Sequence, residues 1–285
     1  MNNSLSTGQS ESQGRNCVIV TRPRAQLKGL MDRLAQRIVE EKLDCELLGL
    51  PLLEIEALGD SFLAKDLNEA LSSADLIVFV SPNAVISAKD LLSANQYVWP
   101  QGCVVGVVGG GTEQSIKDSG LMPKELIKPA ASSSWDSEGL WAVLNAPEKK
   151  WAGKRVTFVK GQAGRSWLMD QLTQQGAEVQ AFEVYRRTPL AISDSAWAAI
   201  ANVYQATQNQ PIWLLTSSEA VYQIPNSLEK LGLPIDSLKR SKSISSHQRI
   251  MQAAQEVGFG DVKLCEAGDL NLVDATIALL KSPNA

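Results

Sequence analysis

Residues 76–85, with the sequence LIVFVSPNAV, decide the fold class of this chain. Leu76–Val80 is an apolar run rich in β-branched residues, and after a polar turn a helical pattern extends from about Asn83 to Ala94. A strand that is apolar at every position is typical of a parallel sheet covered on both faces. The same strand–turn–helix theme recurs along the chain, which predicts an α/β protein. Further strands are predicted at 18–21, 104–108, 156–159, 212–215 and 243–245, and the first helix at 25–39.

Three strand–helix segments occur twice in the same order. Their copies follow at offsets of 136, 138 and 138 residues (217 − 81, 168 − 30 and 247 − 109). Near-constant spacing favours a tandem duplication over chance similarity of α/β units. The paired segments are 81–85 with 217–221, 30–34 with 168–172, and 109–120 with 247–258.

Two extended segments fall outside this theme. Glu46–Ala57 and Glu178–Pro189 each follow the first helix of a repeat, and strands in that position could join two lobes as a connecting ladder. The alternative is one linear boundary in the polar stretch 146–151.

Length and composition predict a globular protein that is long enough for two domains, with one large domain as the alternative. The chain has 285 residues, 44% hydrophobic and 20% charged. The net charge of −4 argues against broad binding of nucleic acid, although a local basic cleft stays open. The four scattered cysteines form no CxxC pair and there is a single histidine, so buried reduced thiols are expected rather than a zinc site.

The sequence predicts a cytoplasmic protein that does not enter a membrane. No apolar stretch approaches the roughly 20 residues that span a bilayer. The first 15 residues are rich in Ser, Gln, Asn and Gly and lack the apolar core of a secretory signal. They predict a disordered tail.

The turns after the predicted strands carry the candidate binding residues. Ligands bind at the carboxyl ends of parallel strands, where helix N-termini also offer N–H groups to anions. Two such edges facing each other would form a cleft suited to a polyanionic ligand. The candidates are Thr21, Arg22, Ser81, Asn83, Gly110, Thr112, Lys160, Gly161, Arg165, Thr216, Ser217, Ser218, His247 and Arg249.

Each candidate also has a purely structural interpretation. The hydroxyl residues are good helix N-caps, and His247 could be structural rather than a general base. Gly109–Gly111 lacks the Gly-Lys-Ser/Thr ending of a P-loop. Arg186-Arg187 is interpreted as a solvated charge pair, with Tyr185 packed beside it. No Ser–His–Asp order or carboxylate pair stands out, which favours catalysis by binding and positioning.

The motifs together resemble the uroporphyrinogen-III synthase family from about Cys17 to Leu280. The similarity rests on their order and spacing. They are VIVTRPRAQ (18–26), PLLEIEAL (51–58), VFVSPNAV (78–85), VVGGGT (107–112), EVYRRTP (183–189), LLTSSEAV (214–221) and SSHQRIMQAAQEVGF (245–259).

The resemblance implies an interleaved two-lobe architecture. Two lobes with parallel sheets flanked by helices would be joined by a two-stranded antiparallel ladder, with the active site in the cleft between them. Lobe 1 would comprise 17–50 and 188–285, lobe 2 would comprise 51–187, and 1–16 would be the tail. This arrangement replaces the linear boundary.

The resemblance also implies the reaction. The substrate would be hydroxymethylbilane, a linear tetrapyrrole with acetate and propionate groups, and no metal or cofactor would be needed. Loss of water gives an azafulvene, and the terminal pyrrole attacks through its substituted carbon to form a spiro intermediate. Reclosure yields the III isomer with that ring inverted, whereas unassisted closure gives the I isomer. Such catalysis works by positioning.

Roles for particular residues follow from the matching motifs. Tyr185 would help the hydroxyl leave as a general acid, and Thr112 would face the cleft. Ser81, Asn83, Ser217 and Ser218 would contact substrate carboxylates. Ser246–Arg249 depart from the Gly/Pro/Thr turn common in the family, so no role carries over to them.

Two rival functions remain open on the sequence, with a monomer expected in each case. One is a non-catalytic two-lobe protein that binds a small anion. The other is a nucleotide-using transferase, which should show a phosphate loop or a ribose-binding acid.

Overall fold

The computed structural model describes residues 16–130, 135–206, 211–230 and 232–282. The tail predicted for residues 1–16 therefore lies outside the described residues except at Asn16. That residue is the first of β1 (Asn16–Val20) and is paired in parallel register with Cys45. Asn16 therefore belongs to the first sheet, and the tail stays a prediction for residues 1–15.

The chain divides into two compact units. One holds the described residues of Met1–Leu52 and Leu190–Ala285, and the other holds Leu53–Pro189. The polar stretch 146–151 lies inside the second unit, so no boundary falls there. The expected cleft between lobes stays a prediction. None of the described helices is long and apolar enough to cross a membrane.

The first unit contains a five-stranded parallel sheet in the order β11-β10-β9-β1-β2. One face packs apolar residues of β1, β9 and β10 against α1 and α12. On the other face, Trp213 is fully buried and contacts Phe259 and Tyr204. The strands are β1, β2 (Cys45–Gly49), β9 (Ile212–Leu215), β10 (Lys242–Ser245) and β11 (Asp261–Leu264). The helices are α1 (Arg24–Glu40), α7 (Asp194–Ala206), α8 (Ser218–Val221), α9 (Ile224–Lys230), α10 (Asp236–Lys239), α11 (Gln248–Glu256) and α12 (Asp269–Leu280).

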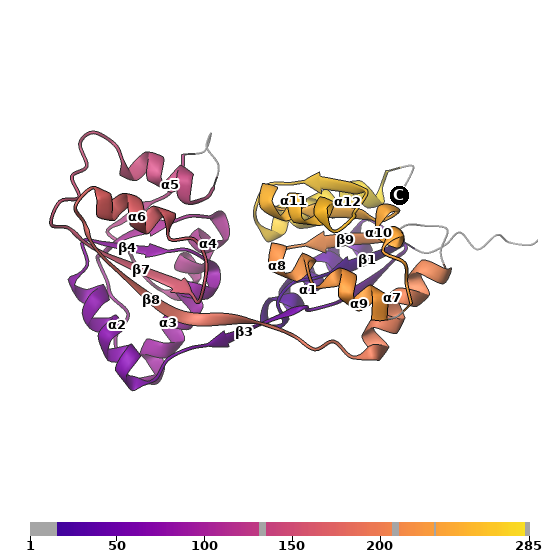
Figure 1. The fold of residues 1–285 in the computed structure, drawn as a ribbon, viewed down its shortest axis with the longest axis horizontal. Coiled ribbons are helices and arrows are strands. Elements are labelled where there is room, and N and C mark those ends of the chain that lie inside the picture. Colours follow the sequence, from indigo (N-terminus) through magenta and orange to yellow (C-terminus); the bar gives the residue numbers. More distant parts are fainter. Residues whose placement is uncertain (1–15, 131–134, 207–210, 231, 283–285) are drawn as a thin grey trace, which may run out of the picture. The chain divides into compact units, whose positions relative to one another are not determined.

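The second unit contains a six-stranded sheet in the order β3-β8-β7-β4-β5-β6. Helices α2, α3 and α4 pack on one face and α5 and α6 on the other, a layering that Figure 1 shows around β4 and β7. The strands are β3 (Leu53–Ala57), β4 (Leu76–Phe79), β5 (Val104–Val107), β6 (Glu125–Ile127), β7 (Arg155–Gly161) and β8 (Glu178–Pro189). The helices are α2 (Ser61–Ser73), α3 (Pro82–Ala94), α4 (Gly110–Ser119), α5 (Ser137–Leu144) and α6 (Trp167–Gln174).

The predicted single run Glu46–Ala57 is two strands in two different sheets. β2 pairs in parallel with β1, whereas β3 pairs antiparallel with β8. Pro51 lies between them, and because proline has no N–H to donate it interrupts a ladder. The N–H of Leu50 still bonds to Val20 of the first sheet, whereas the carbonyl of Leu52 accepts from Leu190. The chain leaves one unit for the other within these three residues.

The two sheets have the same strand order when their elements are matched through the repeat. β1 then corresponds to β7, β2 to β8, β4 to β9, β5 to β10 and β6 to β11, and each unit takes elements from both repeats. Strand order reverses direction between β1 and β9 in the first unit and between β4 and β7 in the second. Ligands of open α/β sheets bind beyond the carboxyl ends of the strands at such switch points.

Candidate active-site residues

At the switch point of the second unit, a serine and a tyrosine are hydrogen-bonded. Ser81 follows β4 and caps α3, where its Oγ accepts from the N–H of Ala84 at 3.1 Å. The same Oγ lies 2.9 Å from the Tyr185 phenol oxygen. Tyr185 is only 2% exposed, whereas Ser81 is half-buried. The serine is therefore the more accessible of the two hydroxyls.

An irregularity in the ladder between β7 and β8 sets the position of Tyr185. Lys160 pairs with Glu183 and Gly161 pairs with Tyr185, so Val184 is an extra residue on β8. Such bulges redirect side chains and are common beside active sites. Val184 and Tyr185 are both buried as a result. A Cβ atom on Gly161 would lie 2.5 Å from Tyr185 Cζ, so only glycine leaves room for this ring.

Arg187 is a residue that the sequence interpretation missed. Its Nη2 donates to the Tyr185 phenol oxygen at 3.3 Å, and its Cζ lies 5.7 Å from the ring centroid. Arg186 and Arg187 are both exposed, as expected of a solvated charge pair, and Arg187 in addition contacts Tyr185. The available signal was the two-residue spacing on a strand, which places Tyr185 and Arg187 on one face.

At the switch point of the first unit, Thr21 and Arg22 follow β1. Thr21 is 1% exposed and its hydroxyl donates to the carbonyl of Leu214 at 2.9 Å, which ties β1 to β9. Arg22 is partly exposed and pairs with Asp269, the first residue of α12. Asp269 was not among the predicted residues. Its position 247 residues away along the chain gave no sequence signal.

The turn after β9 contributes three more candidates at this switch point. Ser217 caps α8 by accepting from the N–H of Ala220 at 3.4 Å, as Ser81 does for α3. Thr216 Oγ1 is buried and has no hydrogen-bond partner among the described residues. Ser218 is the first residue of α8 and is half-buried. Hydroxyls and helix N–H groups therefore gather at this edge.

The predicted lysine and arginine of the second unit are already paired with carboxylates. Lys160 Nζ lies 3.3 Å from Glu183 and Arg165 Nη2 lies 2.5 Å from Glu138. Arg165 holds the pKa of Glu138 below its ordinary value by donating this hydrogen bond. An anionic ligand must therefore share these cations with the protein's own carboxylates.

Four of the remaining candidates follow β5 or β10, the strands next to the switch-point strands β4 and β9. Asn83 instead follows β4 itself. In the second unit, Gly110 begins α4, and Thr112 in its first turn is only 2% exposed. In the first unit, His247 caps α11 because its Nδ1 accepts from the N–H of Arg249 at 3.1 Å. Asn83 is half-buried in the first turn of α3. Seven candidate binding residues thus lie at the carboxyl end of the sheet in each unit, and Tyr185 lies on β8 of the second unit.

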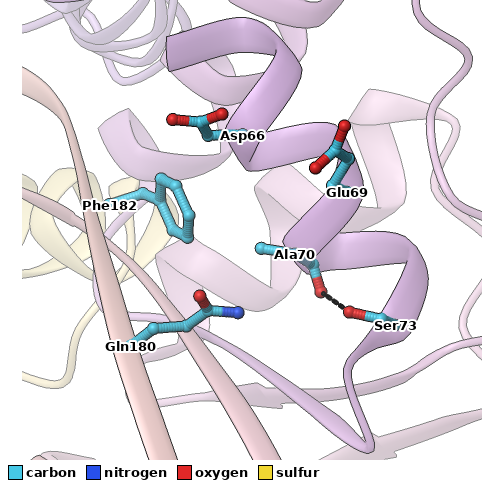
Figure 2. Close-up of a pocket in the computed structure, with 6 residues that line it drawn as sticks. All are labelled: Asp66, Glu69, Ala70, Ser73, Gln180 and Phe182. Carbon is cyan, nitrogen blue, oxygen red and sulfur yellow. Dashed lines mark hydrogen bonds between the residues drawn. The ribbon is translucent and has the colours of Figure 1, made fainter. Parts of the chain in front are cut away.

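A separate pocket of about 390 Å³ lies between α2 and β8 (Figure 2). It contains none of the predicted site residues. The carboxylates of Asp66 and Glu69 line it beside Phe182 and Gln180. Carboxylates in this position repel a polycarboxylate ligand, so the pocket does not fit the expected substrate.

The remaining groups considered are candidate metal ligands and the cysteines. No cluster of three or more His, Cys, Asp or Glu side chains there could hold a metal ion. All four cysteines are free thiols. Burial raises the pKa of the Cys103 and Cys265 thiols, which keeps them protonated at neutral pH.

Similarity to known proteins spans most of the chain. A family model described as uroporphyrinogen-III synthase HemD matches residues 32–268. The uroporphyrinogen-III synthase of Escherichia coli K12 is 27% identical over 201 residues, covering 70% of this chain and 77% of that protein. That of Salmonella typhimurium LT2 is 27% identical over 254 residues, covering 88% and 96%.

Two solved structures share the fold. A mutant uroporphyrinogen III synthase from Thermus thermophilus has a TM-score of 0.57 at 16% identity, covering 94% of this chain and 100% of that chain. The uroporphyrinogen-III synthetase from Helicobacter pylori 26695 has a TM-score of 0.52 at 14% identity, covering 93% and 99%. At these identities the likeness establishes the architecture alone.

Proposed function

Because this chain belongs to the uroporphyrinogen-III synthase (HemD) family, we propose that it closes hydroxymethylbilane into uroporphyrinogen III. The reaction releases water and inverts the terminal pyrrole ring, as a step of tetrapyrrole and haem biosynthesis. The observation that carries this function is the family match over residues 32–268, which includes strand–helix units of both repeats. The chain is an enzyme of the lyase class.

The Ser81–Tyr185 pair supplies the proton in the dehydration step of this proposal. The carbon–oxygen bond of the hydroxymethyl group breaks, and the departing oxygen takes a proton from the Ser81 hydroxyl. Ser81 in turn takes the proton of Tyr185, whose oxygen lies 2.9 Å away. The burial of Tyr185 supports this relay, because the half-buried serine is the more accessible group. The proton released after ring closure restores the phenol.

The switch-point turns hold the substrate carboxylates. Ser217 and Ser218, and the N-termini of α8 in the first unit and α3 in the second, offer hydroxyl and N–H donors to an anion. Arg22 binds a carboxylate in addition to Asp269 or in exchange for it, since its guanidinium has five donors. Holding several carboxylates fixes the chain in the geometry that favours the spiro route, which is catalysis by positioning. Those remaining predicted binding residues that are at least partly exposed support this role by lying at the same two edges, whereas Thr21, Thr112 and Gly161 are buried.

Location and assembly belong to the same proposal. The four free thiols suit a reducing compartment, which supports a cytoplasmic enzyme. A monomer is proposed because each unit buries its own core against its own helices.

Product analysis tests the function. The protein is incubated with freshly generated hydroxymethylbilane, and the uroporphyrinogen I and III isomers are separated after oxidation. We expect the III isomer to predominate at a rate above spontaneous closure. Formation of the I isomer alone at the spontaneous rate would refute the proposal and favour a non-catalytic anion-binding protein. Such a protein would bind hydroxymethylbilane without changing its product.

A further inference from the structure

The guanidinium of Arg187 contacts the phenol of Tyr185. The two side chains lie on one face of β8 because they are two residues apart on a strand. The guanidinium donates to the phenol oxygen at 3.3 Å and also lies 5.7 Å from the ring centroid. Although Arg187 is exposed, its guanidinium therefore contacts both the oxygen and the ring of the buried phenol that bonds to Ser81.

No carboxylate of the described residues competes for Arg187. The residues opposite this face on β3 are Ile55, paired with Arg187, and Ala57, paired with Tyr185. Neighbouring Arg186 instead faces Glu56 and pairs with it at 2.7 Å. Arg187 thus differs from Arg22, Lys160 and Arg165, each of which has a carboxylate partner.

The hydrogen bonds around the phenol oxygen are compatible with transfer of its proton to Ser81, since either hydroxyl can donate in the Ser81–Tyr185 bond. Arg187 can only donate, so the phenol oxygen accepts from it. Ser81 Oγ already accepts from the Ala84 N–H and retains a second lone pair for the phenol proton. When that proton passes to Ser81, the phenolate left behind remains beside a guanidinium. A cation at this distance stabilises the new charge.

We propose that Arg187 is a positioning residue for Tyr185: it orients the phenol towards Ser81 and stabilises the phenolate formed during dehydration. This inference rests on the proposed function. It adds a residue whose effect on the reaction passes through Tyr185 rather than through contact with the substrate. The proton moves from Tyr185 to Ser81 and on to the departing water, and it returns after ring closure.

A double-mutant cycle tests the inference. The kcat, KM and isomer ratio are measured for the wild-type protein, R187M, Y185F and R187M/Y185F, with R187K as the conservative variant. The matched control is R186M, which removes the neighbouring guanidinium of the same strand. Melting temperatures and circular dichroism verify that every variant is folded. Wild-type formation of the III isomer establishes the underlying function independently.

The outcomes separate three roles. We expect R187M to lower kcat about 10-fold with KM unchanged, because it removes a hydrogen bond to a charged group. R187K should recover most of this loss, and R187M should have less than about a twofold effect in the Y185F background. An equal loss in both backgrounds would overturn the proposal in favour of a structural role. A raised KM with unchanged kcat would overturn it in favour of a substrate contact.

Discussion

The phenol oxygen of Tyr185 lies 2.9 Å from the hydroxyl oxygen of Ser81, although 104 residues separate them in the chain. The sheet order brings them together, because β7 lies between β4 and β8. The bulge at Gly161 then places the ring over the glycine.

Replacing Tyr185 with phenylalanine should lower kcat about 10- to 100-fold without abolishing activity. General acid catalysis contributes more than this when it is lost completely, but a positioned water can replace the phenol. The measurement is turnover of hydroxymethylbilane together with the ratio of III to I isomer. If Y185F had the turnover and isomer ratio of the wild-type protein, Tyr185 would have no catalytic role.

Replacing Gly161 with alanine should displace the Tyr185 ring. The new Cβ would lie 2.5 Å from Cζ and 2.7 Å from Cε2 of Tyr185, so the ring must move. We expect a loss of about 1–3 kcal/mol in the free energy of unfolding and a fall in kcat of roughly 100-fold. The control is G29A on α1, where a Cβ meets nothing within 4 Å. Normal kcat in G161A would show that the position of the phenol is unimportant.

Replacing Arg22 with glutamine should raise KM about 10-fold with little effect on kcat. This change removes a charged donor that we assign to a substrate carboxylate. Steady-state kinetics with hydroxymethylbilane at low salt measure the effect. R37Q is the control, because Arg37 also pairs with carboxylates but lies in the last turn of α1. Equal KM values for R22Q and wild type would contradict the assignment.

Asp75 should stabilise the second unit in a pH-dependent way. It accepts from the N–H of Arg155 at 2.8 Å and from Lys154 Nζ at 3.0 Å. These bonds hold the pKa of Asp75 below its ordinary value, the backbone bond contributing most. Because the pKa is lower in the folded state, the stabilisation is present above the unfolded pKa. It is lost as the pH falls through the folded pKa.

Urea unfolding of D75A checks this effect. We expect a loss of about 1 kcal/mol at pH 7, and the difference from wild type should shrink as the pH falls below about 4. D66A is the control, since Asp66 is an exposed carboxylate on α2 with no ion pair to the described residues. A deficit in D75A that stays constant with pH would indicate that the charge of Asp75 contributes nothing.

Much of the fold could be predicted because its signals are local. The apolar run Leu76–Phe79 predicted a covered parallel strand, and it is fully buried. Ser81 and Ser217 were expected to be N-caps, and both accept the predicted kind of N–H bond. The run Glu46–Ala57 was predicted as one segment because both halves are extended. Pro51 separates two strands because the residues before it pair in one sheet and the residues after it pair in the other.

The candidate site was less accessible to sequence reasoning. The predicted turns do follow strands of the two sheets, whereas binding at these edges stays a prediction. The carboxylates that pair with Arg22 and Arg165 were not predicted, because Asp269 and Glu138 lie far away in the chain. Arg187 is exposed, as predicted, but its contact with Tyr185 was not predicted, since that contact depends on which face of β8 each residue occupies.

By itself, the sequence determined the strand–turn–helix units, their repetition at an offset of about 138 residues and the family to which they belong. These properties depend on apolar periodicity, capping and glycine placement, which act over a few residues. Only the tertiary structure decided which units share a sheet and which carboxylate pairs with each cation. It also decided which hydroxyl meets the phenol of Tyr185. Those choices depend on packing between segments that lie from 23 to 247 residues apart, and local hydrogen bonds do not constrain such contacts.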